Sequence, residues 1–302
     1  MLLVVGGTGD LGGRVVRLLR DQGNEVRCLV REGSDDSELR RLGVQVTSGD
    51  LTEPGSLAAA CQGIATIVAT ATVIARRLAG AKKPSIKEAD EVGMASLVDA
   101  AEAAGVRRFV YISFPGVEDA SGSPLELAKL AIEKRLERST LQRVVVRADA
   151  FQEIHLAPLG RFDLAAGKVA VIGKGNSRRR WISTADVAAL LAAVAVEPDP
   201  PTLIEVGGPE AISRNEAVAI AEALIGRPLK VQHMPRLVAR LAVRLLSRSN
   251  DGLASVFGTG LLQDVRAADW DDEPLRRRGI EPRSATTYLR EQVRLLADTQ
   301  KH

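Results

Sequence analysis

A glycine-rich turn near the start of the chain constrains the fold more than any other feature. The segment VVGGTGDLGG, residues 4–13, places five glycines in ten positions directly after the apolar run Leu2–Val5. A tight turn from a strand into a helix needs residues without side chains. A pyrophosphate needs bare backbone near a helix start, where free N–H groups and the helix dipole attract an anion. The spacing Gly6, Gly9, Gly12 therefore predicts a dinucleotide-binding turn rather than an ordinary glycine-rich loop.

Beyond this turn, short apolar runs alternate with helical patterns. The runs are apolar throughout, which is typical of parallel strands covered by helices on both faces. We therefore expect an α/β fold: a Rossmann-type doubly wound parallel sheet in residues 1–150, then a small, mostly helical substrate lobe in residues 151–302 that is partly interleaved with the sheet. The expected strands are 2–5, 26–30, 44–47, 64–70, 109–112, 143–146, 169–172 and 203–206. The expected helices are 10–21, 37–42, 54–61, 91–104, 126–139 and 185–196, with mostly helix after residue 206.

Composition excludes several classes of protein. The net charge of +3 is small beside 41 basic and 38 acidic residues, and aromatic residues are only 3% of the chain, so we expect no nucleic-acid partner. No apolar run reaches the roughly 18 residues of a membrane helix, and Met1 enters its apolar run without a basic leader, so we expect a cytoplasmic protein. Cys28 and Cys61 lack ligand spacing, so we expect neither a disulfide nor a bound metal.

The end of the second expected strand bears on the choice of dinucleotide. NAD sites commonly present a carboxylate to the ribose 2′-hydroxyl there, whereas NADP sites present a cation to the 2′-phosphate. This chain has Arg31 followed by Glu32. Arg31 favours NADP(H) over NAD(H), and an arginine that is merely solvated is the alternative.

Six short motifs occur along the chain in an order that is specific for one superfamily. They are GGTGDLGG at 6–13, LVR at 29–31, GDL at 49–51, AGVRRFVYIS at 104–113, VRADAF at 146–151 and WISTADVA at 181–188. Together they resemble the atypical short-chain dehydrogenase/reductases, in particular the NmrA-like and isoflavone-reductase-like NAD(P)-binding proteins. The resemblance covers most of the chain and names no substrate.

The resemblance implies positions for the cofactor. Asp50 and Leu51 would lie near the adenine, and Thr70 and Ala71 would line the nicotinamide side of the crevice, with Ser113 beside them. The physics of open parallel sheets agrees, because ligands collect where the winding reverses, here between the first and fourth strands. Asp50 could equally be the N-cap of a helix over 51–60. The turn residues expected to contact the cofactor are Gly6, Thr8, Gly9, Asp10, Leu11 and Gly12.

The usual catalytic tyrosine of this superfamily is missing. Its members use Tyr-x-x-x-Lys, in which a phenol of lowered pKa exchanges a proton with the substrate. Lys129 is in the right context, but Leu125 stands where the tyrosine belongs, and Tyr111 and Tyr288 have the wrong spacing. Lys129 could still fix the nicotinamide ribose or, if desolvated, donate a proton. The alternative is a surface lysine on an amphipathic helix whose buried side is formed by Leu127, Leu130, Ala131 and Leu136.

Two classes of function remain from these residues. The first is an oxidoreductase that transfers hydride from NAD(P)H to a small carbonyl, enone or quinone. Lys129 would be its catalytic residue, and its partner would be a small-molecule substrate, which is lipophilic if it is a quinone. A reduced quinone oxygen is a weak base and needs little help from an acid, so a quinone suits the missing phenol. The second is a non-catalytic NADP(H) sensor or assembly protein, which Leu125 favours. Epimerase or dehydratase chemistry is disfavoured because it normally relies on that phenol.

Basic segments in the second half have functional and structural interpretations. The run Arg178–Arg180 could hold an anionic group or form a solvated loop, while Asp186 is expected to bind backbone at a helix start. His155 could be an acid, although a lone histidine is more often structural. In Arg236–Arg248, arginines recur at every fourth residue. A helix that packs its leucines on the fold is favoured there over a membrane-surface helix or the mouth of a lipophilic site.

Overall fold

A seven-stranded parallel sheet forms the centre of the protein. The computed structural model describes residues 1–119 and 121–299. The strand order β10-β6-β5-β4-β1-β2-β3 reverses direction between β1 and β4, where the sequence places the crevice. The strands are β1 Leu2–Val5, β2 Val26–Val30, β3 Gln45–Ser48, β4 Thr66–Ala69, β5 Arg108–Ser113, β6 Gln142–Ala148 and β10 Leu203–Val206. The Rossmann-type fold is thereby confirmed.

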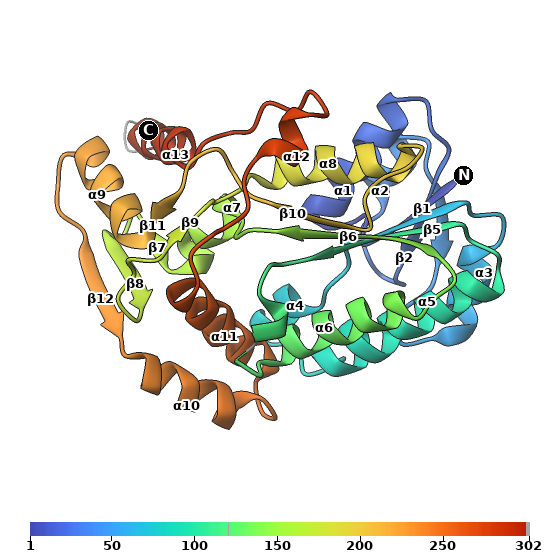
Figure 1. Cartoon of the computed structure of the whole chain (residues 1–302), viewed down its shortest axis with the longest axis horizontal. Helices are drawn as coiled ribbons and strands as arrows, with labels where there is room; N and C mark the ends of the chain where they lie inside the picture. The colour runs from blue at the N-terminus through green and yellow to red at the C-terminus, as the bar shows by residue number, and fades with distance from the viewer. Residues whose placement is uncertain (120, 300–302) are drawn as a thin grey trace.

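Helices cover both faces of the sheet (Figure 1). One face carries α1 (Asp10–Asp21) and α8 (Thr184–Val196), which pack side by side. The other face carries α3 (Pro54–Cys61), α5 (Met94–Ala103) and α6 (Pro124–Glu137). Because successive strand residues point to opposite faces, each strand contributes to two apolar cores. The remaining short helices are α2 (Ser37–Arg41), α12 (Glu273–Arg276) and α4 (Ile74–Leu78), which contacts α11.

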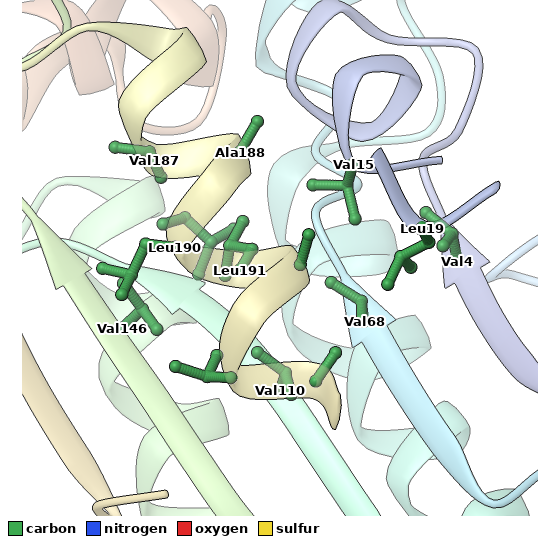
Figure 2. Close-up of a cluster of buried hydrophobic side chains, with 14 of the residues drawn as sticks. Val4, Val15, Leu19, Val68, Val110, Val146, Val187, Ala188, Leu190 and Leu191 are labelled. Atoms are coloured by element: carbon green, nitrogen blue, oxygen red, sulfur yellow. The ribbon is translucent and has the colours of Figure 1, made fainter. Parts of the chain in front are cut away.

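The core beneath α8 joins distant parts of the chain. Figure 2 shows Leu190 and Leu191 of α8 among Val68, Val110 and Val146 of the sheet. All five side chains are fully buried. Helix α8 and strand β10 come from beyond residue 150, so the second half of the chain completes the sheet begun by the first.

The remaining second half forms the smaller lobe beside the carboxyl edge of the sheet. It holds a three-stranded sheet in the order β12-β8-β7, a two-stranded pair of β11 with β9, and mostly helix otherwise. The strands are β7 Phe162–Asp163, β8 Lys168–Ile172, β9 Arg178–Arg179, β11 Ile212–Ser213 and β12 Lys230–Met234. The helices are α7 Gln152–His155, α9 Arg214–Ile225, α10 Arg236–Leu246, α11 Asp251–Val265 and α13 Ala285–Thr299. The chain after residue 206 is mostly helical, as expected, and the strands β11 and β12 are the additions that the sequence did not indicate.

Helix α6 buries a side that coincides only in part with the expected one: Leu136 is buried as expected, and Leu130 and Ala131 are half-buried. Leu127 is 50% exposed, whereas Lys129 is 6% exposed and Glu133 is also buried. The inner side of α6 meets α11 and the π-helical segment η1 (Lys87–Gly93). The sheet supplies partners for the inward charged residues, because Lys129 donates to the Ile112 carbonyl oxygen in β5 and Glu133 pairs with Arg147 in β6.

Helix α10 corrects the interpretation of its arginine pattern. Three of its four leucines do not pack on the fold: Leu237, Leu241 and Leu245 are exposed and Leu246 is half-buried, while the fully buried residues of the helix are Ala239 and Val243. Small inward residues allow α10 to lie close along α11, so the longer apolar side chains are left outside. Within residues 1–119 and 121–299, no helix has the length and apolar character needed to cross a membrane.

Candidate functional site

The glycine turn brings β1, α1 and β4 into direct backbone contact. Gly6 has a positive φ of 102°, and its carbonyl oxygen accepts a 3.0 Å hydrogen bond from the Gly9 N–H. A Cβ atom added at Gly6 would lie 2.7 Å from both Thr70 Oγ1 and the backbone nitrogen of Ala71. A Cβ atom at Gly12 would lie 2.2 Å from the Gly6 oxygen. Both glycines are therefore required by packing alone.

Gly9 serves a different purpose. A Cβ atom there would meet only the Gly6 oxygen, at 3.3 Å, and Thr8, Gly9 and Asp10 are exposed. Gly9 is the N-cap of α1 and has no side chain to satisfy the first-turn N–H groups. Asp10 turns aside to pair with Arg14 at 2.8 Å. The exposed bare backbone at a helix start fits a pyrophosphate.

Leu11, Thr70 and Ala71 hold the glycine turn against the ends of β1 and β4. Leu11 is half-buried against the α1 core, and the carboxyl ends of β1 and β4 meet here. Thr70 Oγ1 and the Ala71 N–H both donate to the carbonyl oxygen of Val5, at 3.2 and 3.0 Å. These bonds hold the end of β4 against β1, so Thr70 and Ala71 lie at the point where the strand order reverses.

Arg31 and Glu32 follow β2 and are both exposed. Within the part of the chain that the structure describes, the Arg31 guanidinium has no hydrogen-bond or ion-pair partner, and its carbonyl accepts from the Ser34 N–H. A guanidinium without an internal partner at the end of β2 suits a 2′-phosphate.

Asp50 and Leu51 follow β3, and Leu51 lines a pocket. Asp50 Oδ1 accepts from the Thr52 N–H at 2.8 Å and from the Thr52 hydroxyl at 2.7 Å, and α3 begins only at Pro54. The N-cap interpretation of Asp50 is therefore wrong, because its carboxylate closes a turn that precedes the helix. Leu51 lines a pocket of about 490 Å³, whose position after β3 suits an adenine. The other lining residues are Thr52, Pro54, Lys83, Pro84, Glu88, Val92, Gly93 and Ser96.

Lys129 is a buried cation at the carboxyl end of β5. Its Nζ donates a 2.8 Å hydrogen bond to the carbonyl oxygen of Ile112 and lies 4.6 Å from the centre of the Tyr111 ring. Burial lowers the pKa of Lys129 to about 8, against the attraction of Asp90 and Glu133. The surface-lysine alternative is wrong. An ammonium of this pKa can donate a proton near neutral pH.

Two buried oxygen atoms in this region lack partners among the described residues. Ser113, at the end of β5, is 4% exposed and its Oγ has no hydrogen bond. Asp90, in η1, is 2% exposed; its Oδ2 accepts from the Val73 N–H at 3.1 Å, and its Oδ1 has no partner. Burial raises the pKa of Asp90, and the charge of Lys129 opposes this rise. Buried polar atoms normally find partners, so these oxygens support a site that accepts a polar ligand.

Asp90 was missed from the sequence. It stands in the run KEADEV beside Glu88 and Glu91, which are more exposed. Nothing in the local pattern distinguishes it from them. Only the packing of η1 against α6 brings the Asp90 carboxylate into the environment of Lys129.

Leu125 fills the tyrosine position with apolar packing. It packs against a small cluster formed by Val73, Ile86, Ala89 and Ala128, and its N–H donates to Ser255 Oγ at 3.1 Å. Tyr111 is fully buried, and burial raises its pKa well above the ordinary value. Neither residue supplies an acidic phenol.

The three arginines of the run Arg178–Arg180 all have partners within the protein. Arg179 pairs with the buried Asp149 at 2.5 Å, Arg180 donates to the carbonyls of Gly208 and Pro209, and Arg178 pairs with Glu216. The arginine run therefore ties its segment to three others: the end of β6, the loop after β10 and the start of α9.

His155 and Asp186 are structural as well. Burial lowers the pKa of His155 to about 3, with help from Arg214 and Arg179, so the ring is neutral and packs near Trp181. Asp186 accepts from the Arg283 N–H at 2.9 Å, and burial raises its pKa to about 6. Asp186 also interacts with the backbone of Ser183, the N-cap of its own helix, as expected, and the Arg283 N–H is a second backbone partner remote in sequence.

Comparison with known proteins agrees with this geometry. Residues 6–198 match the family described as NAD(P)H-binding. The NAD(P)H azoreductase of Xenophilus azovorans is 30% identical over 234 residues, which cover 76% of each chain. The photosystem II assembly factor Ycf39 of Trieres chinensis is 28% identical over 249 residues, covering 81% of this chain and 75% of the relative.

Solved structures share the fold over nearly the whole chain. The NADPH-dependent quinone oxidoreductase QOR2 of Escherichia coli, complexed with NADPH, superposes with a TM-score of 0.73 at 22% identity and covers 98% of this chain and 99% of its own. An isoflavone reductase gives a TM-score of 0.72 at 20% identity, covering 96% and 98%. At these identities the likeness establishes the fold.

Proposed function

We propose that this chain, which belongs to the NAD(P)H-binding family, is a reductase that uses NADPH to reduce a small carbonyl, enone or quinone, with a quinone as the favoured acceptor. The family match confirms the resemblance drawn from the motifs to NAD(P)-binding, isoflavone-reductase-like proteins. The observation that carries the proposal is the buried ammonium of Lys129 at the carboxyl edge of the sheet, where the pKa of this lysine is lowered to about 8.

The described residues fit a dinucleotide along this edge. The backbone at Gly9 and the start of α1 would hold the pyrophosphate, Arg31 the 2′-phosphate, and the pocket beside Leu51 the adenine. Thr70 and Ala71, with the free Oγ of Ser113, would line the nicotinamide side. When bound, the nicotinamide supplies a hydride to the acceptor.

Lys129 would complete the reduction. A lysine ammonium has three N–H donors, and one is used by the Ile112 oxygen. The remaining donors can orient a ribose hydroxyl or place a proton on the oxygen of the reduced acceptor. A pKa near 8 leaves the group mostly protonated at neutral pH while keeping proton transfer favourable. The oxygen of a reduced quinone is a weaker base than an alkoxide, so it needs less help from a proton donor.

The test compares NADPH oxidation across a panel of quinones in wild type, Lys129→Ala and Lys134→Ala. Lys134 lies on the same helix but is exposed, so it controls for loss of a positive charge on α6. We expect Lys129→Ala to reduce kcat/KM by roughly 100-fold or more, the usual contribution of a positioned acid, while Lys134→Ala stays near wild type. Equal activity in all three proteins would contradict the assignment of Lys129.

A second candidate function is a non-catalytic NADPH-binding assembly or regulatory protein. Two observations favour it: Leu125 fills the tyrosine position with apolar contacts, and a relative at 28% identity is named as an assembly factor. The same assay separates the two. Measurable NADPH binding without turnover of any acceptor would support the assembly or regulatory function and reject the reductase.

A further inference from the structure

Helix α10 presents an apolar ridge to solvent. Leu237 is 76% exposed, Leu241 56%, Leu245 66% and Val238 50%. The three leucines are spaced by four residues, so they form one row along the helix. The opposite side of α10 packs on α11, and Figure 1 places the helix at the outer margin of the smaller lobe. We call Leu237, Val238, Leu241 and Leu245 the α10 ridge.

Arginines flank this ridge. Arg240, Arg244 and Arg248 are exposed, and none of them pairs with another of the described residues. By contrast Arg236, at the start of the helix, pairs with Asp264. Helical spacing places the three exposed arginines along one flank of the ridge. The sequence between residues 222 and 251 has six lysines and arginines and no acidic residue, so nothing nearby in sequence neutralises them.

A hollow of about 460 Å³ adjoins the cationic flank. It lies between α10 and the loop that precedes α6. Arginine guanidinium groups pair well with phosphate oxygens, and small polar residues leave room for such a group. The lining residues are Ser121, Gly122, Arg240, Val243, Arg244 and Ser247.

We propose that α10 docks this protein on the surface of an anionic lipid bilayer. The ridge would enter the boundary between headgroups and acyl chains, and the arginines would contact lipid phosphates, with Arg240 and Arg244 taking one headgroup into the hollow. A helix that lies in the interface requires an apolar side and a cationic flank within one short segment, which is the arrangement here. Arginine stems are long enough to reach the headgroup level while the leucines are immersed.

The charge pattern favours a bilayer over a second copy of the chain. A symmetric contact through the ridge would bring the arginine flanks of both copies together, because such an interface uses the same patch twice. The flank offers no carboxylate to offset that repulsion. In an anionic bilayer, the acyl chains would contact the leucines of the ridge and the negative headgroups would contact the arginines of its flank. This inference does not depend on the proposed reductase activity.

The experiment is co-sedimentation of the full chain with two kinds of vesicle, phosphatidylcholine alone and equimolar phosphatidylcholine with phosphatidylglycerol. Two double variants test the surface: Leu241→Gln with Leu245→Gln, and Arg240→Gln with Arg244→Gln. The control is Arg107→Gln with Arg138→Gln, which removes the same charge from exposed positions before β5 and β6, at the amino edge of the sheet. NADPH binding and the far-ultraviolet circular dichroism spectrum verify that each variant is folded.

We expect wild type and the control to bind the anionic vesicles and not the neutral ones. The arginine variant should lose roughly 30-fold in partitioning, about fivefold for each charge removed near an anionic surface. The leucine variant should lose at least roughly tenfold. The proposal is overturned if wild type ignores anionic vesicles, or if both α10 variants bind as the control does. It is also overturned if the variants instead convert a dimer to a monomer in light scattering, which would identify a self-association surface.

Discussion

Lys129 crosses from α6 to the sheet and donates a 2.8 Å hydrogen bond to the carbonyl oxygen of Ile112. The Tyr111 ring lies beneath the same ammonium, 4.6 Å away at its centre. These two neighbours and the negative charge of Asp90 allow a cation to remain in a place where water cannot solvate it. The ammonium is thereby held at the carboxyl end of β5, which neighbours the carboxyl end of β4 in the sheet.

Reductase activity should fall as the pH rises through about 8. The group that donates must carry its proton, and burial lowers the pKa of Lys129 to about 8, so the active form is lost above that pH. The measurement is the pH profile of kcat/KM for quinone reduction by NADPH. Lys129→Arg keeps its charge at every pH studied and should lack this limb. An unchanged alkaline limb in Lys129→Arg would assign it to another group.

Asp90→Asn should shift the alkaline limb to lower pH. The carboxylate of Asp90 favours the charged form of Lys129, so removing it lowers the pKa of that lysine further. Glu91→Gln is the matched control, because it removes a neighbouring carboxylate that is more exposed. A merely structural role for Asp90 would reduce activity at every pH and leave the limb in place. The comparison therefore needs full pH profiles, not a single rate.

Gly12→Ala should lower the stability of the protein, whereas Gly9→Ala should lower its affinity for NADPH. The added Cβ atom at Gly12 would lie 2.2 Å from the Gly6 oxygen, so we expect a loss of stability of about 1–3 kcal/mol, as for an overpacked site. At Gly9 the nearest atom is 3.3 Å away, so the protein should fold. Its affinity for NADPH should nevertheless fall by roughly tenfold or more, about 1.4 kcal/mol, because the methyl group occupies backbone that the pyrophosphate approaches. Thermal unfolding and NADPH titration distinguish the two effects.

Arg31→Ala should weaken NADPH binding and leave NADH binding nearly unchanged. A charge-assisted hydrogen bond to the 2′-phosphate is worth about 1.5–3 kcal/mol, which is roughly 10- to 150-fold in Kd. NADH lacks that phosphate, so the substitution should not change its affinity. The measurement is a pair of titrations on wild type and variant. Tighter binding of NADH than NADPH by wild type would reverse the cofactor preference.

Arg179→Met should destabilise the fold without touching the cofactor. Arg179 and Asp149 form a buried ion pair at 2.5 Å, and the substitution leaves the carboxylate without its counter-charge, at a cost of about 3–5 kcal/mol. The neighbouring Arg178 forms an exposed pair with Glu216, so Arg178→Gln should cost less than about 1 kcal/mol. Urea unfolding gives both values. If folded Arg179→Met lost affinity for NADPH, the run Arg178–Arg180 would have a role in cofactor binding after all.

Much of the fold could be predicted because its first half follows simple periodicities. The helices Asp10–Asp21 and Pro54–Cys61 occur at their predicted bounds, and the switch between β1 and β4 follows from the strand order of a Rossmann sheet. The glycine turn could be predicted because close backbone contact requires glycine, and the glycines are visible in the sequence. Strand β12, Lys230–Met234, was missed because it is largely exposed and its run KVQHM is mixed in polarity.

The parts that could not be predicted depend on which side of a helix meets another element. The burial of Lys129 and Asp90 follows from the packing of α6 against η1, which the local sequence of neither segment indicates. The exposure of Leu237 on α10 arises because Ala239 and Val243 give the closer contact with α11. In both cases the sequence shows an amphipathic helix, but tertiary contacts decide its orientation.

Helix α8 reaches the sheet late in synthesis. A ribosome releases β1, β4, β5 and β6 before it releases Thr184–Val196, so the apolar face that Leu190 and Leu191 cover is bare in the nascent protein. Pairing of β6 with β10 must wait as well. We therefore expect the emerging first half to be a client of chaperones, and a fragment ending near residue 150 to aggregate rather than bind nucleotide.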